Sequence, residues 1–131
     1  MKMKKVLAAL FIVCLILSTL ALAETKSFRF VVVPTNTTNE YQVGARALKS
    51  DNEQRFYVTT TSNGFPDNRA MFYISCDDSG ALISNTVRNT GNAAYKQTAP
   101  KDKHYKLAYR TGRKPSDPET MSYIVEGRWT P

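Results

Sequence analysis

The sequence is poor in the side chains on which catalysis and metal binding most often depend. It contains one histidine, His104, and two cysteines, Cys14 and Cys76. Because Cys14 lies in an N-terminal apolar run, one chain cannot build a zinc site from histidine and cysteine. A serine–histidine–acid triad would have to use His104, and no local motif joins Cys76 to His104. We therefore predict a protein that is not an enzyme and that holds no metal and no cofactor.

Glycine-rich and carboxylate motifs are also missing. The six glycines are scattered, so the sequence has no loop of the kind that cradles phosphate. Most acidic residues stand among turn-forming residues, where aspartate is favoured for backbone reasons. The stretch 77–80 (DDSG) lacks the alternating ligands and the closing glutamate of a calcium loop, so it predicts a turn.

The first 23 residues have the three-part plan of a secretory signal peptide. A mostly apolar run over 6–23 follows three lysines in the first five residues and ends in the small residues Ala21 and Ala23. We expect cleavage after Ala23, which leaves residues 24–131 as an exported protein. That protein would be secreted, or periplasmic in a Gram-negative host. An uncleaved anchor is the alternative, because the run reaches the lower length limit of a membrane-spanning helix.

The basic charge is mild and is not gathered in one block. Removing the signal peptide takes three of the 18 basic residues, and the remaining 15 against 11 acidic residues give a net charge of +4. Such a charge attracts anionic envelope polymers or membrane surfaces. No run resembles a nucleic-acid-binding arm, so no nucleic acid is expected as a partner. Cys76 is expected to be buried and inert on a strand, and a disulfide between two chains is the alternative.

Strand signals occupy the chain after the signal peptide, and no helical stripe is present. The stretch 70–76 is apolar on both faces, which predicts a central, buried strand, and Trp129 is expected to close the core. On 41–48 the alternation places Tyr41, Val43, Ala45 and Ala47 on one face. The eight predicted strands with intervening turns indicate a single all-β domain, an antiparallel sandwich or a barrel-like variant of one. Their predicted ranges are 27–33, 41–48, 55–61, 70–76, 81–89, 93–98, 103–110 and 121–129.

The segment 101–114 is the strongest candidate for a binding site. It holds six basic residues and a single acid, beside two tyrosines. Alternation places Lys106 and Arg110 on the solvent face of a strand, while Arg113 and Lys114 belong to the loop that follows. A basic strip beside aromatic rings can engage an anionic polymer or a membrane surface. The alternative is that the tyrosines face the core and the lysines only protect an edge strand from aggregation.

Two short stretches carry a resemblance to a known group of proteins. The domain opens with Phe28-Arg29-Phe30 and closes with the stretch 123–129 (YIVEGRW), in a cysteine-poor chain with a signal peptide. This layout resembles the small secreted proteins of Gram-positive bacteria that surround lactococcin-type bacteriocins. The resemblance implies a β-sandwich and an exported factor that acts at a cell envelope.

Two functional hypotheses follow. The first is a non-enzymatic exported protein that binds at a cell envelope in a bacteriocin-like role, with Lys106, Arg110, Arg113 and Lys114 making the contact. The second is a structural or assembly protein, a homo-oligomer or a partner of another protein, that pairs through strand edges or through Cys76.

Overall fold

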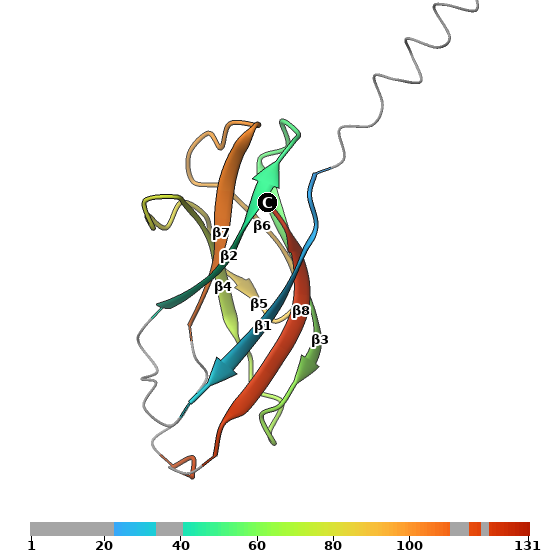
Figure 1. The fold of residues 1–131 in the computed structure, drawn as a ribbon, viewed down its shortest axis with the longest axis vertical. Coiled ribbons are helices and arrows are strands. Elements are labelled where there is room, and N and C mark those ends of the chain that lie inside the picture. Colours follow the sequence, from blue (N-terminus) through green and yellow to red (C-terminus); the bar gives the residue numbers. More distant parts are fainter. Residues whose placement is uncertain (1–22, 34–40, 111–115, 119–120) are drawn as a thin grey trace, which may run out of the picture.

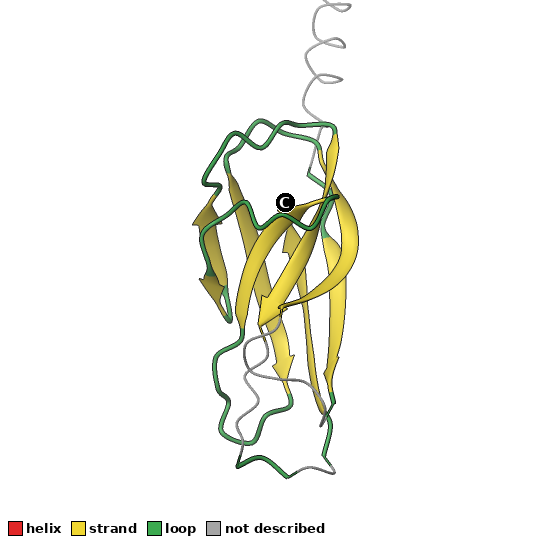
Figure 2. Ribbon diagram, turned by 90° about the vertical axis from the view of Figure 1, so that its left-hand side faces the viewer, coloured by secondary structure: helices red, strands yellow, loops and turns green. Residues whose placement is uncertain are grey.

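A computed structural model describes residues 23–33, 41–110, 116–118 and 121–131 of the protein. Apart from Ala23, the predicted signal peptide lies outside these residues. The described residues form strands and loops and include no helix (Figure 2). The strands are β1 (Lys26–Val32), β2 (Tyr41–Lys49), β3 (Arg55–Asn63), β4 (Phe72–Asp77), β5 (Val87–Arg88), β6 (Gly91–Ala94), β7 (Lys103–Arg110) and β8 (Tyr123–Thr130).

The strands form two four-stranded antiparallel sheets. One sheet has the order β1-β8-β3-β6 and the other the order β2-β7-β4-β5. In Figure 1, β2, β4 and β7 lie to the left and β1, β3 and β8 to the right, so the two sheets face each other. The prediction of an all-β domain built as an antiparallel sandwich is confirmed.

The core between the sheets is rich in aromatic rings. The ring of Phe30 stacks on that of Tyr109 with centroids 3.8 Å apart, and Phe28 lies 5.0 Å from Phe30. Burial alternates along β1 and β8, as a period of two residues predicts. Trp129 on β8 is 2% exposed, so its prediction as a core residue is confirmed.

A glycine on β8 allows the ring of Phe28 to lie close to the sheet. Phe28 pairs with Gly127 across β1 and β8. A Cβ atom at residue 127 would lie 2.5 Å from Cζ of Phe28 and 2.2 Å from the carbonyl oxygen of Thr59 on β3. Both distances are far below normal contact, so this junction of three strands has no room for a side chain at residue 127.

The predicted face of β2 is wrong at its first three positions. The pairing of β2 with β7 shifts register between Val43 and Arg46, which is a β-bulge. A bulge reverses which residues face inward, because side chains alternate along a strand. As a result Val43 is 50% exposed and Tyr41 is 40% exposed, while Ala47 is buried on the other face. Ala45 is also exposed.

Two further expectations about strands are corrected by the sheet order. The predicted strands at 81–89 and 93–98 shrink to the two residues of β5 and the four residues of β6. The strand at 103–110 is β7, which lies between β2 and β4 and is therefore not an edge strand. The edge-protection explanation for its lysines fails. The prediction that 70–76 forms a central buried strand is confirmed, because β4 has four consecutive buried residues.

One buried cation, Lys49, and one largely buried cation, Arg69, have acidic partners in the fold. Lys49 is fully buried, and its Nζ lies 2.6 Å from Oδ1 of Asp51 and 5.8 Å from the ring centroid of Tyr95. Arg69 donates two hydrogen bonds to the carboxylate of Asp117, the shorter at 2.5 Å. Opposite charges within hydrogen-bond distance offset the cost of burying them. We therefore assign these two cations to the fold rather than to a binding surface.

Candidate functional site

The outer face of the β2-β7-β4-β5 sheet carries a row of alternating aromatic and basic side chains. In the register of the sheet, Tyr41 on β2 pairs with Arg110 on β7, and Arg110 pairs with Phe72 on β4. Phe72 pairs in turn with Arg88 on β5. Residues paired directly across strands point to the same face, so the four side chains form one row across the whole sheet, which we call the Phe72 row.

A second basic pair lies further along the same face. Arg46 on β2 pairs with Lys106 on β7. Lys106 is two strand repeats from Arg110, and both side chains point away from the core. We call Arg46, Arg88, Lys106 and Arg110 the basic face. These cations come from three strands, and only two of them are near each other in the sequence.

The cations of the basic face are poorly compensated by acids. Among the described residues, Arg46 is the one cation of the four with an ion-pair partner, Asp78 at 3.6 Å. That pair is more than half exposed on both sides, where such contacts contribute little. Like charges on one face repel each other, so their clustering costs energy unless an anionic partner is bound.

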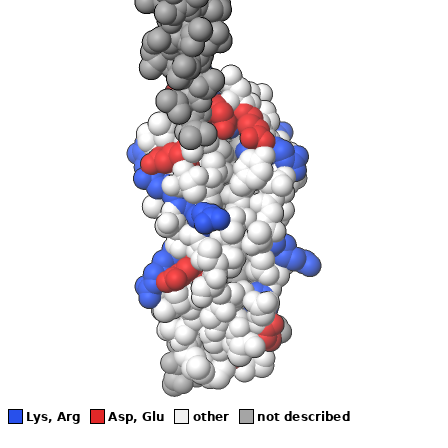
Figure 3. Space-filling model, turned by 90° about the vertical axis from the view of Figure 1, so that its right-hand side faces the viewer, with Lys and Arg blue, Asp and Glu red and all other residues white. Residues whose placement is uncertain are grey.

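The outer face of the other sheet is different. There Arg29 on β1 lies 3.0 Å from Glu126 on β8. Figure 3 views the molecule from the side where β3 and β8 lie in Figure 1, and it shows basic and acidic side chains interspersed. The strands of that sheet also carry the exposed Arg55 and Arg128, so the two outer faces differ in arrangement: here Arg29 pairs with an acid, whereas the basic face gathers two guanidinium groups around one aromatic ring.

Phe72 lies between two guanidinium groups. The Cζ atoms of Arg88 and Arg110 both lie 5.1 Å from the centroid of its ring. Contacts of this kind are attractive and hold the guanidinium planes against the aromatic surface. The Nε atom of Arg110 is buried and has no hydrogen-bond partner among the described residues. The row thus contains a buried donor that an added acceptor would satisfy.

A pocket opens at this row. It has a volume of about 410 Å³ and is lined by Tyr41, Phe72, Thr86, Arg88 and Arg110. Two cations, two aromatic rings and the hydroxyls of Thr86 and Tyr41 line it, and its described lining includes no acid. The pocket is suited to an anionic group attached to a body of small-ligand size.

The floor of the basic face is apolar. Ile74, Cys76 and Ala108 form a buried cluster on this side of the sheet, separate from the main core. Lys106 and Arg110 beside it are half-buried, and long basic side chains of this kind pack their aliphatic stems against apolar surface. This packing limits the freedom of the two cations and so lowers the entropy cost of binding through them.

The structure brings together half of the residues predicted from the sequence. Lys106 and Arg110 lie on the outer face of β7, as alternation predicted, but Arg110 belongs to the row that contains Phe72, whereas Lys106 pairs with Arg46. Arg113 and Lys114 lie outside the described residues. Their part in the site stays a prediction.

Sequence reasoning missed the other members of the site. These members come from three different strands, and only the register of the sheet aligns them with β7. They are Arg46, Arg88, Phe72 and Tyr41. Because side chains alternate along a strand, Phe72 and Tyr73 point to opposite faces of the strand over 70–76, which is a usable signal. Nothing local indicates Arg88, because its strand has only two residues.

Cys76 is buried and chemically protected. Its side chain is fully buried on β4, and Sγ donates to the carbonyl oxygen of Lys106 at 3.4 Å. Burial raises the pKa of the thiol, which disfavours the thiolate that forms disulfides or attacks substrates. The expectation of a buried cysteine on a strand is confirmed, and a disulfide between chains would require the sulfur to become exposed.

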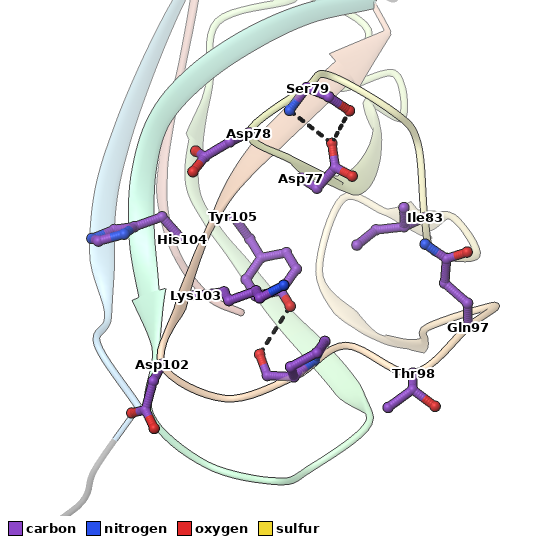
Figure 4. Close-up of a pocket in the computed structure, with 11 residues that line it drawn as sticks. Asp77, Asp78, Ser79, Ile83, Gln97, Thr98, Asp102, Lys103, His104 and Tyr105 are labelled. Carbon is purple, nitrogen blue, oxygen red and sulfur yellow. Dashed lines mark hydrogen bonds between the residues drawn. The ribbon is translucent and has the colours of Figure 1, made fainter.

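A second pocket, of about 630 Å³, lies at the opposite end of β4 and β7 (Figure 4). Its acidic side chains and His104 do not converge on one point in Figure 4, and among the described residues no group of His, Cys, Asp and Glu could hold a metal ion. Asp77 is engaged in a turn, where its Oδ1 accepts the backbone N–H of Ser79 at 2.8 Å. Hydrogen bonds from Ser79 lower the pKa of Asp77. The predicted turn at 77–80 is confirmed.

The fold and the face define the class of this protein as an all-β sandwich with a basic, aromatic-containing outer sheet face. No helix among the described residues is both long and apolar enough to cross a membrane. A scan against protein-family models, a search of curated proteins and a search of solved structures each found no match. The function is therefore argued from the site.

Proposed function

We propose that this protein is an exported, non-enzymatic factor that binds anionic material of a cell envelope through the basic face. The observation that carries the proposal is the collection of Arg46, Arg88, Lys106 and Arg110 on one sheet face with a single acidic partner among the described residues. A polymer or membrane surface with repeated negative charges would contact several of these cations at once. Such contacts add up and would hold the protein at the envelope.

Export is part of the same proposal. Its support is the signal-peptide pattern of the first 23 residues. The full chain, expressed in a bacterial host from its own start, should be recovered outside the cytoplasm. Its intact mass should correspond to residues 24–131. Recovery of the uncleaved chain in the membrane fraction would favour an anchored protein, and recovery in the cytoplasm would remove the envelope from the proposal.

The binding experiment compares two variants that lose the same charge. In the first, Arg88, Lys106 and Arg110 are replaced by glutamine. In the matched control, Arg29, Arg55 and Arg128 on the strands of the other sheet are replaced by glutamine. Wild-type protein and both variants are sedimented with whole bacterial cells at about 50 mM and 500 mM salt, and cell viability is counted in the same samples.

The wild type and the control should bind at low salt and be released at high salt, because exposed charges are screened over a shorter distance there. The basic-face variant should fail to bind. Equal loss in both variants would mean that only net charge matters and would overturn the assignment to this face. Binding accompanied by killing of the cells supports the bacteriocin-like role. A further variant with Arg113 and Lys114 replaced by glutamine tests the prediction that these two residues contribute to binding.

Self-assembly is the second candidate, and one observation favours it. Among the described residues, the edge strands β1 and β2 each pair with one strand of their sheet, although Glu24 hydrogen-bonds to Leu48 near the end of β2. A groove of about 320 Å³ lies between the two strands. An unpaired strand edge can add a strand from another chain. Sedimentation velocity of the wild type should show a monomer if the protein binds the envelope. It should show concentration-dependent dimers or polymers if the protein assembles through these edges.

A further inference from the structure

We infer that the Phe72 row is a discrete site for one anionic sugar unit, a sugar ring that carries a phosphate or a carboxylate. The inference rests on the proposed function and goes further, because it separates one part of the basic face from the rest. Arg46 and Lys106 contribute general attraction. Arg88 and Arg110, with Phe72 and Tyr41, recognise a particular chemical group.

The geometry of the cations points to an oxyanion. The Cζ atoms of Arg88 and Arg110 lie at equal distances, 5.1 Å, from the ring of Phe72, on neighbouring strands to either side of it. A guanidinium group held against a ring keeps its N–H edge free, and that planar edge matches two oxygens of a phosphate or carboxylate. The buried Nε of Arg110, without a partner among the described residues, would gain an acceptor.

The remaining lining points to a sugar as the body that carries the anion. The ring of Tyr41 is 40% exposed and offers flat apolar surface, against which the C–H face of a sugar ring packs. Thr86 adds a hydroxyl that can both donate and accept a hydrogen bond. A volume of about 410 Å³ lies within the range of small-ligand pockets. It accommodates a single sugar with its anion, so a polymer would present one unit here while its neighbours pass over Lys106 and Arg46.

The same chemistry could come from a repeating wall polymer or from a free sugar phosphate, and two assays separate these sources. The first titrates the protein with glucose 6-phosphate, glucuronate, glucose and inorganic phosphate, and follows the arginine Nε–Hε signals by NMR. The second measures binding to purified phosphate-containing wall polymer. We expect glucose 6-phosphate or glucuronate to shift the signals of Arg88 and Arg110 at concentrations where glucose and inorganic phosphate do not.

Variants that keep or remove the charge test recognition against general attraction. Arg88→Gln should weaken polymer binding by about tenfold, as expected for a hydrogen-bonded charge pair. Arg88→Lys keeps the charge but loses the planar edge, so it should weaken binding almost as much. Arg46→Gln removes the same charge from an exposed position of the same face and should weaken binding by about threefold at most. Arg88 and Arg46 are both exposed, so these variants are expected to fold, and circular dichroism checks that they do.

Two results would overturn the inference while leaving the proposed function intact. One is equal weakening by Arg88→Gln and Arg46→Gln, with Arg88→Lys unchanged, which is the behaviour of diffuse attraction. The other is a response of Arg88 and Arg110 to inorganic phosphate as strong as that to the sugar phosphate. Failure of the wild type to bind any envelope material would instead overturn the proposed function itself. Binding of the monomer but not of the polymer would assign the site to free sugar phosphates.

Discussion

Replacing Gly127 by alanine should destabilise the sandwich by about 3 kcal/mol, the upper end of the range for overpacking. A Cβ atom there would meet the carbonyl oxygen of Thr59 at 2.2 Å and Cζ of Phe28 at 2.5 Å. The Phe28 ring cannot simply turn away, because it stacks on Phe30. The oxygen belongs to the backbone of β3, so relief requires β3 and β8 to move apart and to weaken the hydrogen bonds between them.

The assay is urea unfolding followed by the fluorescence of Trp129, the one tryptophan of the chain. For a domain of this size, a loss of about 3 kcal/mol lowers the melting temperature by about 12–24 °C. Gly80→Ala is the matched control, because Gly80 has a φ of +85° and a Cβ added there would have no atom within 4 Å. Gly80→Ala should lower the free energy of unfolding by about 1 kcal/mol, because alanine is strained in a left-handed backbone conformation. If Gly127→Ala cost no more than Gly80→Ala, the packing argument for the β1–β8–β3 junction would be wrong.

Two further predictions concern buried polar side chains. Lys49→Met should leave the free energy of unfolding unchanged or raise it by about 1 kcal/mol, because a similar volume is kept and a buried charge is removed; Lys49→Ala should lower it by about 2 kcal/mol in the same urea assay. Burial raises the pKa of Tyr73 and of Tyr109 to about 12 from an ordinary 10.0. The stability that these neutral phenols contribute is complete below pH 10 and is lost as the pH rises toward 12. Thermal unfolding between pH 8 and 12 should show this fall, and a flat profile would contradict it.

The strands were predictable where alternation alone decides them. On β1 and β8 one face is buried and the other is largely solvated, so the period of two residues is visible in the sequence. On β7 the basic residues keep the same period visible, although Ala108 on its outer face is buried. For β2 the same reasoning predicted the wrong face, because one extra residue near Gly44 reverses the alternation. Gly44 was a usable signal, because an isolated glycine inside a strand pattern often marks a bulge. The existence of the bulge follows from the way β2 must pair with β7.

The candidate site was predictable only in the part that lies on one strand. Lys106 and Arg110 share a face of β7 by alternation, and the sequence places them there correctly. Strand order is a non-local property, however, and the sequence does not say that β7 lies between β2 and β4. Arg46, Phe72 and Arg88 join the site only through that order, so no reading of separate segments could have assembled the row.

The core and the basic face draw on alternate residues of the same strands, and this separation is what makes the proposed function testable. β7 sends Tyr105, Leu107 and Tyr109 into the core and presents Lys106 and Arg110 on the other side. A substitution of the cations therefore leaves the core contacts in place, and a loss of binding can be attributed to lost contacts with the ligand rather than to unfolding. A mixed-charge surface like that of the other sheet would keep the domain soluble without repulsion between like charges. The collection of cations around Phe72 is unnecessary for solubility, which is why we propose an anionic ligand for it.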